Sequence, residues 1–373
     1  MKVALVHDYL LDYGGAERVL YELHKIFPQA PIYVSLVDKK GMGKFWEKFE
    51  NIDIRKSWFG NLPFSSKLIS PLRFLLPFIW ENFSFTDYDL VITSASWAVT
   101  KGMKKGDKTK EICYLHTPPR YLYGYDTSRK WEEKWYGALI TIYATIINHF
   151  MRMYDFKSAQ KVDYFIVNSK NVGERVEKFY RRSDYQVIYP PVDVEKIIKL
   201  KKKVAKDNYF LTGGRMVASK NFDLIIKACK KAKVNLKIFG TGTEGEKLSK
   251  PANYNVEFLG RISDEQLIAY YKGAKAFILA QSDEDFGITP IEAAAAGCPS
   301  IAYKGGGYLE SVVEGKTGVF FDELTVDSLA KTIKNFNLSI YRNIKPSDCI
   351  EHAKKFSKER FVGEINKFVA NRM

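Results

Sequence analysis

The sequence predicts an α/β protein made of two doubly wound parallel-sheet domains. The chain opens with an apolar run at residues 2–7, then the pair Gly14–Gly15, then a helical pattern. This order of strand, turn and helix begins domains of that class. Short apolar runs and helical patterns go on alternating as far as residue 321. At 373 residues the chain is also long for a single core, so two domains are expected.

The N-terminal domain is expected to cover residues 1–187. Its strands are predicted at residues 2–7, 32–36, 90–93, 112–115 and 165–168, with a helix from Ala16 to about Phe27. The domain is predicted to end where Ile188–Asp193 bring in a pair of prolines. Two prolines stiffen the chain and remove two backbone donors, as suits a linker.

The C-terminal domain is expected to cover residues 188–351. Its strands are predicted near residues 209–213, 234–239, 255–260, 276–281, 299–303 and 318–321. The last stretch, residues 347–373, is amphipathic and predicted to be helical, with Phe356, Phe361, Ile365 and Phe368 on its apolar side. This stretch can cap either domain.

Two aromatic segments interrupt the first domain. Residues 67–85 combine many Leu, Phe, Ile and Trp residues with Lys67 and Arg73, and their prolines prevent one long helix. Such a composition suits either an interfacial membrane segment or a buried face between helices. Residues 121–154 carry eight Tyr or Trp residues and are expected to line a cleft or to lengthen a helix.

Composition restricts the partners and the compartment. A net charge of +15 and a pI near 9.3 indicate anionic partners, which are phosphate ligands, nucleic acid or an acidic membrane. The four cysteines form no CxxC pair, which favours free thiols in a reducing cytoplasm and gives no sign of a zinc site. Because a strand is predicted to start at residue 2, no signal peptide is expected. The sequence contains no uninterrupted run of 18 apolar residues, so no membrane-spanning helix is expected.

Residues 280–297 carry the strongest chemical signal. Glu284 and Glu292 follow a run, residues 276–279, that is predicted to be a buried strand. Ligands of open parallel sheets bind at the carboxyl ends of strands, so two carboxylates there can hold a polyhydroxylated ligand. A purely structural role is equally compatible with the pattern.

That structural role is a helix start. Thr289 is expected to be the N-cap, Pro290 the first helical residue and Glu292 the acid of a capping box. Gly297 is expected to stop the helix. Under this interpretation Glu284 has no structural duty.

A second candidate lies after the strand at residues 209–213. Gly213 and Gly214 are followed by Arg215 and Lys220 in the loop before the next helix. An arginine fork and a mobile lysine charge together suit a diphosphate, although two basic residues near each other are also expected by chance among 58.

Three further features are weaker on their own. Gly14 and Gly15 can present backbone N–H groups to an anion or can form a plain tight turn. Gly240, with Gly242, makes a similar turn in the second domain. His116 ends the strand at residues 112–115, where an imidazole can act at a reacting centre or be structural.

Some kinds of chemistry lack a signature. The sequence contains no GxSxG, HExxH or P-loop motif and no Ser, His and Asp in a triad order, which argues against hydrolases and NTPases. Asp283 and Asp285 resemble an acidic metal clamp, but we expect the two glutamates to occupy their loop and predict no metal site.

Taken together, these motifs resemble the retaining glycosyltransferases of family 4, of the GT-B type, over nearly the whole chain. The match consists of Gly14–Gly15, the loop at His116, Asn168–Ser169, the VIYPPVD linker, GGRxxxxK at Gly213–Lys220 and E-x7-E at Glu284–Glu292. The segments VHDYLLDYGGAERV and LHTPPRY look most like bacterial mannosyltransferases that build O-antigen or other surface polysaccharides from GDP-mannose.

The resemblance implies a fold and roles for these residues. Two Rossmann-like domains would face each other across a cleft, with the donor held by the C-terminal domain, the acceptor by the N-terminal one, and a helix from about residue 352 to 373 crossing back. The catalytic group would be Arg215, Lys220, Glu284 and His116. The remaining donor-binding residues would be Gly14, Gly15, Gly214, Gly240, Asp285, Phe286, Gly287, Ile288 and Glu292.

The implied activity is metal-independent transfer of a sugar, mannose from GDP-mannose first, to a lipid-linked or surface glycan, with no cofactor. We expect a cytoplasmic enzyme, peripheral at the inner face of the plasma membrane and in contact with anionic lipid. The alternatives are a related transferase that uses UDP-glucose or UDP-N-acetylglucosamine, a nucleotide-sugar epimerase and a nucleic-acid-binding protein. No nucleic-acid-binding motif supports the last.

Overall fold

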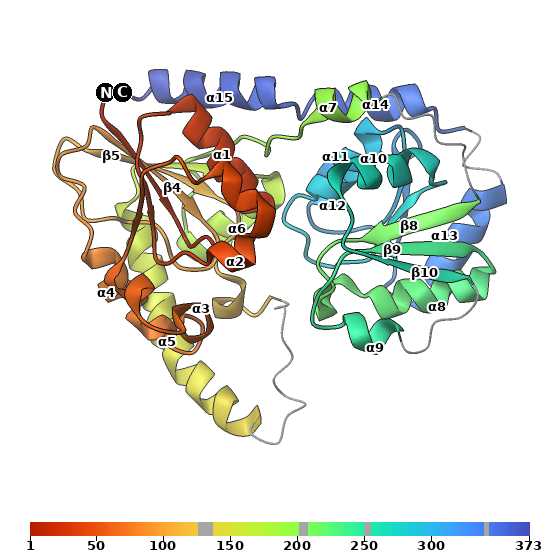
Figure 1. The fold of residues 1–373 in the computed structure, drawn as a ribbon, viewed down its shortest axis with the longest axis horizontal. Helices are drawn as coiled ribbons and strands as arrows, with labels where there is room; N and C mark the ends of the chain where they lie inside the picture. Colours follow the sequence, from red (N-terminus) through yellow and green to blue (C-terminus); the bar gives the residue numbers. More distant parts are fainter. Residues whose placement is uncertain (126–136, 201–207, 250–254, 339–342) are drawn as a thin grey trace. The chain divides into compact units, whose positions relative to one another are not determined.

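The protein folds into two compact units, each around its own parallel sheet (Figure 1). The computed structural model describes residues 1–125, 137–200, 208–249, 255–338 and 343–373. The N-terminal unit consists of residues 1–125, 137–191 and 361–373, and the C-terminal unit of Val192–Arg360. Two doubly wound α/β units confirm the predicted fold class. The chain passes between them after Pro191 rather than after residue 187, and returns at Phe361 rather than near residue 352.

The N-terminal unit has a seven-stranded sheet in the order β3-β2-β1-β4-β5-β6-β7, and all its pairings are parallel. The strands are β1 (Val3–His7), β2 (Ile32–Val34), β3 (Ile54–Lys56), β4 (Leu90–Ala95), β5 (Lys110–Leu115), β6 (Tyr164–Val167) and β7 (Tyr185–Val187). β3 and β7 were not predicted from the sequence. Both are three-residue edge strands, and the two cationic residues of β3 are exposed.

Helices cover both faces of this sheet. They are α1 (Gly15–Ile26), α2 (Lys39–Met42), α3 (Ser65–Leu68), α4 (Leu76–Glu81), α5 (Gly137–Lys161) and α6 (Lys170–Tyr180). Side chains of β1 alternate between the two faces. Val3 and Leu5 pack with α1 and with the end of the chain, while Ala4 and Val6 pack with α4 and α5.

The aromatic segment at residues 67–85 is mainly a packing element. Leu76, Ile79 and Trp80 are buried in the core beside the sheet, and the Trp80 indole N–H donates to the carbonyl oxygen of Ala98 at 2.8 Å. Phe74 and Phe78 remain exposed. The structure therefore supports the packing interpretation for most of this segment. Of the segment at residues 121–154, Trp131, Trp135 and Tyr136 lie outside the described residues.

The C-terminal unit has a six-stranded parallel sheet in the order β10-β9-β8-β11-β12-β13. The strands are β8 (Tyr209–Gly213), β9 (Asn235–Phe239), β10 (Val256–Gly260), β11 (Phe277–Leu279), β12 (Ser300–Tyr303) and β13 (Gly318–Phe321). All six were predicted to within two residues of their observed ends. The near-continuous apolar character of β8, β11, β12 and β13 reflects burial on both faces of a parallel sheet, whereas β10 is an edge strand.

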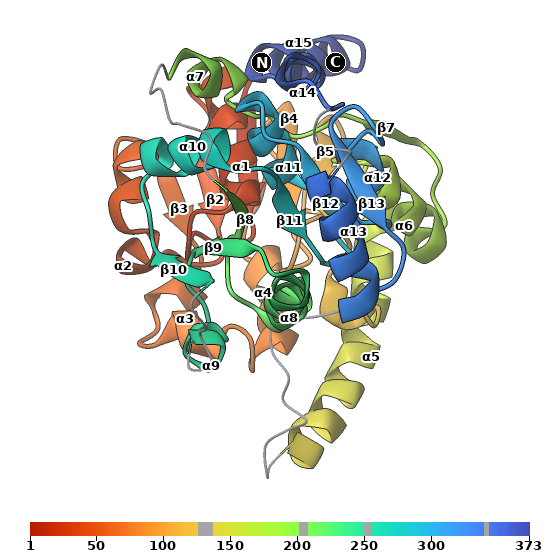
Figure 2. The ribbon, with the colours of Figure 1, turned by 90° about the vertical axis from the view of Figure 1, so that its right-hand side faces the viewer.

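Helices also flank this second sheet. They are α7 (Val194–Lys199), α8 (Phe222–Ala232), α9 (Gly245–Ser249), α10 (Asp264–Gly273), α11 (Ile288–Ala295), α12 (Tyr308–Ser311), α13 (Val326–Leu338) and α14 (Pro346–Lys354). The helices α8 and α13 pack together on one face, and α10 and α11 lie on the other (Figure 2). All four cysteines of the chain are described, and each is a buried thiol rather than half of a disulfide.

The chain ends in two helices, α14 and α15 (Lys358–Ala370), with a break between them. Phe356 lies in the break and contacts Phe286, with ring centroids 5.3 Å apart. Phe361, Ile365 and Phe368 of α15 are buried against the first sheet. The predicted apolar side of this stretch is confirmed, and it serves both units.

Candidate functional site

The second sheet has one point where its strand order reverses. After β8 the chain continues to β9 on one side, and it later returns to add β11 on the other side of β8. At such a point the loops after the two central strands diverge and leave a crevice outside their carboxyl ends, where open α/β sheets bind ligands. The two strongest sequence motifs are the loops after β8 and after β11.

The loop after β8 holds the predicted cationic pair. Gly214 has φ +120°, and a Cβ built on it would lie 3.1 Å from the Lys220 Nζ, so the lysine amino group lies close to the glycine backbone. Arg215 is exposed and Lys220 is half-buried. Asn221 donates from its side-chain nitrogen to the carbonyl oxygen of Ala280 at 2.8 Å. This bond joins the loop that carries both cations to the start of the loop that carries Glu284.

Gly240 has a packing reason to be glycine. Its φ is +110°, and a Cβ there would lie 1.9 Å from the carbonyl oxygen of Gly214. The loop after β9 therefore presses directly on the loop after β8. Any side chain at this position would push the backbone beside Lys220 out of place.

The loop after β11 is braced by a glycine-rich turn that the sequence analysis did not single out. The Gly307 N–H donates to the carbonyl oxygen of Glu284 at 2.8 Å, and a Cβ on Gly306 would lie 2.7 Å from that oxygen. The Tyr308 hydroxyl lies 3.4 Å from Glu284 Oε2. Three consecutive glycines at residues 305–307, one residue after a predicted strand, were the available signal.

The predicted capping box at the start of α11 is wrong. The N-cap is Gly287, with φ +87°, so that Thr289 and Pro290 are the second and third helical residues. Glu292 is the fifth and lies too far along to cap. Glycine tolerates the left-handed conformation and lets the helix start earlier, where the missing N–H of Pro290 costs nothing because it would have no helical partner. The predicted stop is confirmed: the helix ends at Ala295, and Gly297 has φ +74°.

Around this turn the side chains divide into two groups. Phe286 is buried and points toward Phe356, so only its backbone is available to a ligand. Glu284, Asp285 and Glu292 are half-buried, and Ile288 is the first residue of α11. The structure thus brings the predicted carboxylates and cations of the C-terminal unit to one edge of its sheet.

The first sheet reverses between β1 and β4, and the remaining predicted residues lie nearby. Gly14 is the N-cap of α1, and its N–H donates to Glu17 Oε2 at 2.8 Å, so this amide serves the helix itself. Gly15 is the first residue of α1. His116 directly follows β5, which is the neighbour of β4, and is 8% exposed.

A buried series of polar side chains links Glu17 of α1 to His116 after β5. His7 Nε2 lies 3.5 Å from Glu17 Oε1, and His7 Nδ1 lies 3.0 Å from the carbonyl oxygen of Ser94. The Ser94 Oγ lies 2.9 Å from His116 Nε2. His7, Glu17 and Ser94 were not predicted as site residues. The glutamate three residues after Gly14 was the one available signal, as a capping-box spacing.

The electrostatics of His7 and Glu17 are those of an ion pair. Burial disfavours the charged ring of His7, but hydrogen bonding and charge attraction from Glu17 outweigh it and raise the pKa of His7 above its ordinary 6.5. Burial likewise works against ionised Glu17, yet His7 and the Gly14 N–H hold the pKa of Glu17 below its ordinary 4.5. Nearby, Asp8 accepts bonds from the Ser96 and Trp97 N–H groups and fixes the loop after β4.

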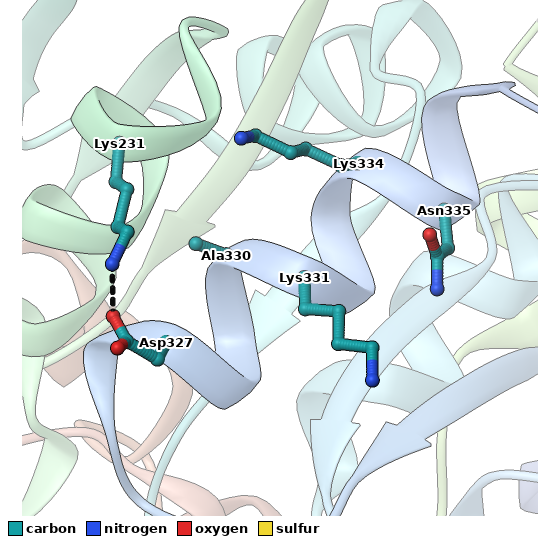
Figure 3. Close-up of a pocket in the computed structure, with 6 residues that line it drawn as sticks. All are labelled: Lys231, Asp327, Ala330, Lys331, Lys334 and Asn335. Atoms are coloured by element: carbon teal, nitrogen blue, oxygen red, sulfur yellow. Dashed lines mark hydrogen bonds and ion pairs between the residues drawn. The ribbon is translucent and has the colours of Figure 1, made fainter.

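A shallow hollow between α8 and α13 lies apart from these residues (Figure 3). It is lined by Lys231, Asp327, Ala330, Lys331, Lys334 and Asn335. The ammonium of Lys231 pairs with Asp327 across it. None of the predicted site residues lines it, and we assign it no role.

Comparison with known families agrees with the geometry. Residues 13–196 match Glycosyltransferase Family 4, and residues 193–356 match Glycosyl transferases group 1. A UDP-N-acetylglucosamine–peptide N-acetylglucosaminyltransferase GtfA subunit of Streptococcus parasanguinis is 22% identical over 82% of this chain and 61% of its own. An alpha-1,3/1,6-mannosyltransferase of Mus musculus is 32% identical over 31% of this chain and 28% of its own.

Solved structures share the fold over the full length. Anabaena HepE in complex with UDP and glucose matches with a TM-score of 0.67 at 19% identity, covering 99% of both chains. The chain spans 61%, 47% and 32% of the length of three curated relatives. The two family matches together run from residue 13 to residue 356 and meet at the linker between the units. The chain is thus a GT-B-type member of the glycosyltransferase family 4 and group 1 families.

Proposed function

We propose that this protein transfers a sugar from a nucleotide diphosphate donor to an acceptor hydroxyl, with retention of the anomeric configuration. The observation that carries the proposal is the meeting of two loops at the reversal point of the second sheet. One loop supplies Arg215 and Lys220, the other supplies Glu284, and Asn221 bonds the first to the start of the second. Diphosphate recognition and sugar recognition would then share one sheet edge.

The proposed chemistry needs charge stabilisation at the leaving group. When the bond between the anomeric carbon and the diphosphate breaks, positive charge develops on the sugar and negative charge on the diphosphate. Arg215, Lys220 and the Gly15 N–H would stabilise the diphosphate, so no divalent metal is required. The acceptor oxygen bonds to the anomeric carbon from the same face, and a phosphate oxygen takes its proton. Glu284 would face the donor sugar and Glu292 the ribose hydroxyls.

We consider two candidate sugar donors. GDP-mannose is our first candidate, because the opening segment and the His116 loop resemble those of mannosyltransferases. A UDP-sugar is the second, because HepE was solved with UDP and glucose and the GtfA relative is named for UDP-N-acetylglucosamine. A thermal-shift panel of GDP-mannose, GDP, UDP-glucose, UDP-N-acetylglucosamine and UDP separates them. A ligand at 100 times its Kd adds about 2.7 kcal/mol to stability.

We further propose a lipid-linked acceptor at an anionic membrane on the cytoplasmic side. No helix among the described residues is long and apolar enough to cross a bilayer. The surface that supports the proposal is on α5, whose N-terminal half extends past α3 and α4 (Figure 1). We call this surface the α5 stripe, and it consists of Leu139, Ile142, Tyr143, Ile146, Phe150 and Met153, which are 36% to 70% exposed.

The α5 stripe suits an anionic lipid surface better than water. Its side chains recur at helical spacing along one side of α5, as in an interfacial helix. Tyr143 lies at the edge of this side and donates its hydroxyl to the carbonyl oxygen of Pro71. At its end, Met153 joins a hollow of about 340 Å³ that is also lined by Phe156, Phe179, Arg152 and Lys157. Apolar side chains flanked by cations match acyl chains beside lipid phosphates.

The transfer proposal is tested by turnover of the donor panel with extracted lipid-linked glycans as acceptor, with products read by mass spectrometry. Arg215→Ala and Lys220→Ala should each lower turnover by about 10²–10³-fold, because each removes a group that stabilises the departing charge. Lys227→Ala on the exposed side of α8 is the matched control and should leave turnover unchanged. Equal turnover in all four proteins would sink the assignment. Activity lost in EDTA would contradict metal independence.

The same assay separates the other classes. A nucleotide-sugar epimerase would release a rearranged sugar with no acceptor present. A nucleic-acid-binding protein would show salt-dependent oligonucleotide binding and no sugar transfer.

A further inference from the structure

Glu17, His7, Ser94 and His116 form a buried series of hydrogen-bonded side chains. The neighbours of each nitrogen and oxygen in this series determine which of them carries a proton. His7 Nδ1 faces the carbonyl oxygen of Ser94 at 3.0 Å, and a carbonyl can only accept, so this nitrogen carries a proton. His7 Nε2 faces a carboxylate oxygen of Glu17, which also only accepts. Both ring nitrogens therefore donate, and His7 is a buried cation.

The proton of the Ser94 hydroxyl then has one destination. Within the described part of the chain, Ser94 Oγ has two hydrogen-bond neighbours, which are His7 Nδ1 at 3.1 Å and His116 Nε2 at 2.9 Å. His7 Nδ1 already carries a proton and has no lone pair to offer. The hydroxyl must donate to His116 Nε2, and this nitrogen has to be unprotonated.

We propose that Glu17, His7 and Ser94 are positioning residues that hold His116 as the neutral tautomer with its proton on Nδ1. The ring then presents an N–H donor on the side away from Ser94. Because Glu17 also accepts the Gly14 N–H, it fixes the start of α1 beside Gly15. The same hydrogen-bonded series thus fixes both the backbone at Gly14 and the tautomer of His116.

The inference rests on the proposed function only for its consequence, which is that His116 donates to the donor sugar. Asp8, the other acid near His7, binds the loop after β4 through the Ser96 and Trp97 N–H groups. Asp8 therefore adds negative charge that favours protonated His7 without taking part in the series.

The direct test is long-range ¹H–¹⁵N NMR of protein labelled at its five histidines. His116→Gln and His7→Gln assign the two rings. At neutral pH we expect His116 to be protonated at Nδ1 alone and His7 at both nitrogens. A proton on Nε2 of His116, or a neutral His7, would overturn the inference. The wild-type spectrum decides this without any variant and without turnover, so its failure is distinct from failure of the proposed function.

Variants test the positioning role. Ser94→Ala should release His116 into a mixture of tautomers and lower kcat/KM for transfer by about tenfold, the worth of roughly one hydrogen bond, with an unchanged Kd for the nucleoside diphosphate. Ser94→Thr keeps the hydroxyl and should restore both the tautomer and kcat/KM. The exposed Ser84→Ala is the control. An unchanged His116 signal in Ser94→Ala would contradict the role of the hydroxyl.

Discussion

The capping acid predicted from the sequence does not cap, and a glutamate that was not predicted bonds a helix start instead. Glu292 has the spacing of a capping acid from Thr289 but lies in the second turn of α11, because Gly287 starts the helix earlier. Glu17 is three residues after Gly14, accepts the Gly14 N–H as the acid of a capping box does, and also pairs with His7. Sequence spacing alone could not separate them, because the difference lies in the φ angle of one glycine.

The pair formed by His7 and Glu17 makes stability depend on pH. The raised pKa of His7 gives a contribution that is complete below pH 6.5 and is lost as pH rises through the raised value. The lowered pKa of Glu17 gives one that is complete above pH 4.5 and is lost as pH falls through the lowered value. The pair therefore stabilises the fold most between pH 4.5 and 6.5.

Glu17→Gln should reveal this dependence. We expect the variant to lose about 3 kcal/mol of unfolding free energy between pH 4.5 and 6.5, because His7 is left buried without its counter-charge. The gap to wild type should narrow as pH rises through the raised pKa of His7. Urea unfolding from pH 4 to 9 measures it. As a control, Asp223→Asn, which breaks an exposed pair with Lys227, should cost under about 1 kcal/mol. A difference in unfolding free energy between Glu17→Gln and wild type that stays constant with pH would refute the pairing of His7 with Glu17.

Among the elements, α5 buries polar contacts toward its C-terminal end and, in the described part of the chain, exposes the α5 stripe toward its start. Asp155 is fully buried, pairs with Lys101 and accepts the Tyr123 hydroxyl at 2.6 Å. Nearer its start, Asn148 accepts from Arg73 Nε at 2.9 Å. From the sequence, residues 67–85 suited either a membrane surface or a packing face; the structure buries Trp80 there and exposes the α5 stripe. The many aromatic residues of the first domain indicated an apolar surface, but which of them are exposed depends on how the helices pack.

Liposome flotation tests the α5 stripe. Replacing Ile146 and Phe150 together by serine should abolish recovery with vesicles that contain anionic lipid, because it removes two large apolar side chains from the surface proposed to enter the bilayer. Leu338→Ser, at a 73% exposed position on α13, is the matched control and should float like wild type. Flotation of the double variant at wild-type levels would reject the surface. A loss of self-association, seen by sedimentation, would show instead that the stripe binds a second copy.

Both sheets could be predicted from sequence, and the geometry of the crevice could not. Eleven strands were visible as apolar runs, whereas β3 and β7 are edge strands with too few apolar residues to show a pattern. Arg215, Lys220 and Glu284 were singled out individually. Their convergence depends on the reversal of strand order at β8 and on Asn221, and neither has a local sequence signal.

The claim that the crevice beside β8 and β11 binds a nucleoside diphosphate is tested most directly by calorimetric titration. GDP, UDP, guanosine and uridine would be titrated into wild type, Lys220→Ala and the control Lys227→Ala. We expect Lys220→Ala to bind the preferred nucleoside diphosphate about tenfold to a hundredfold more weakly, the worth of hydrogen bonds to a charged group, and the bare nucleoside equally well. A Lys220→Ala protein that binds the nucleoside diphosphate as tightly as wild type would contradict the account.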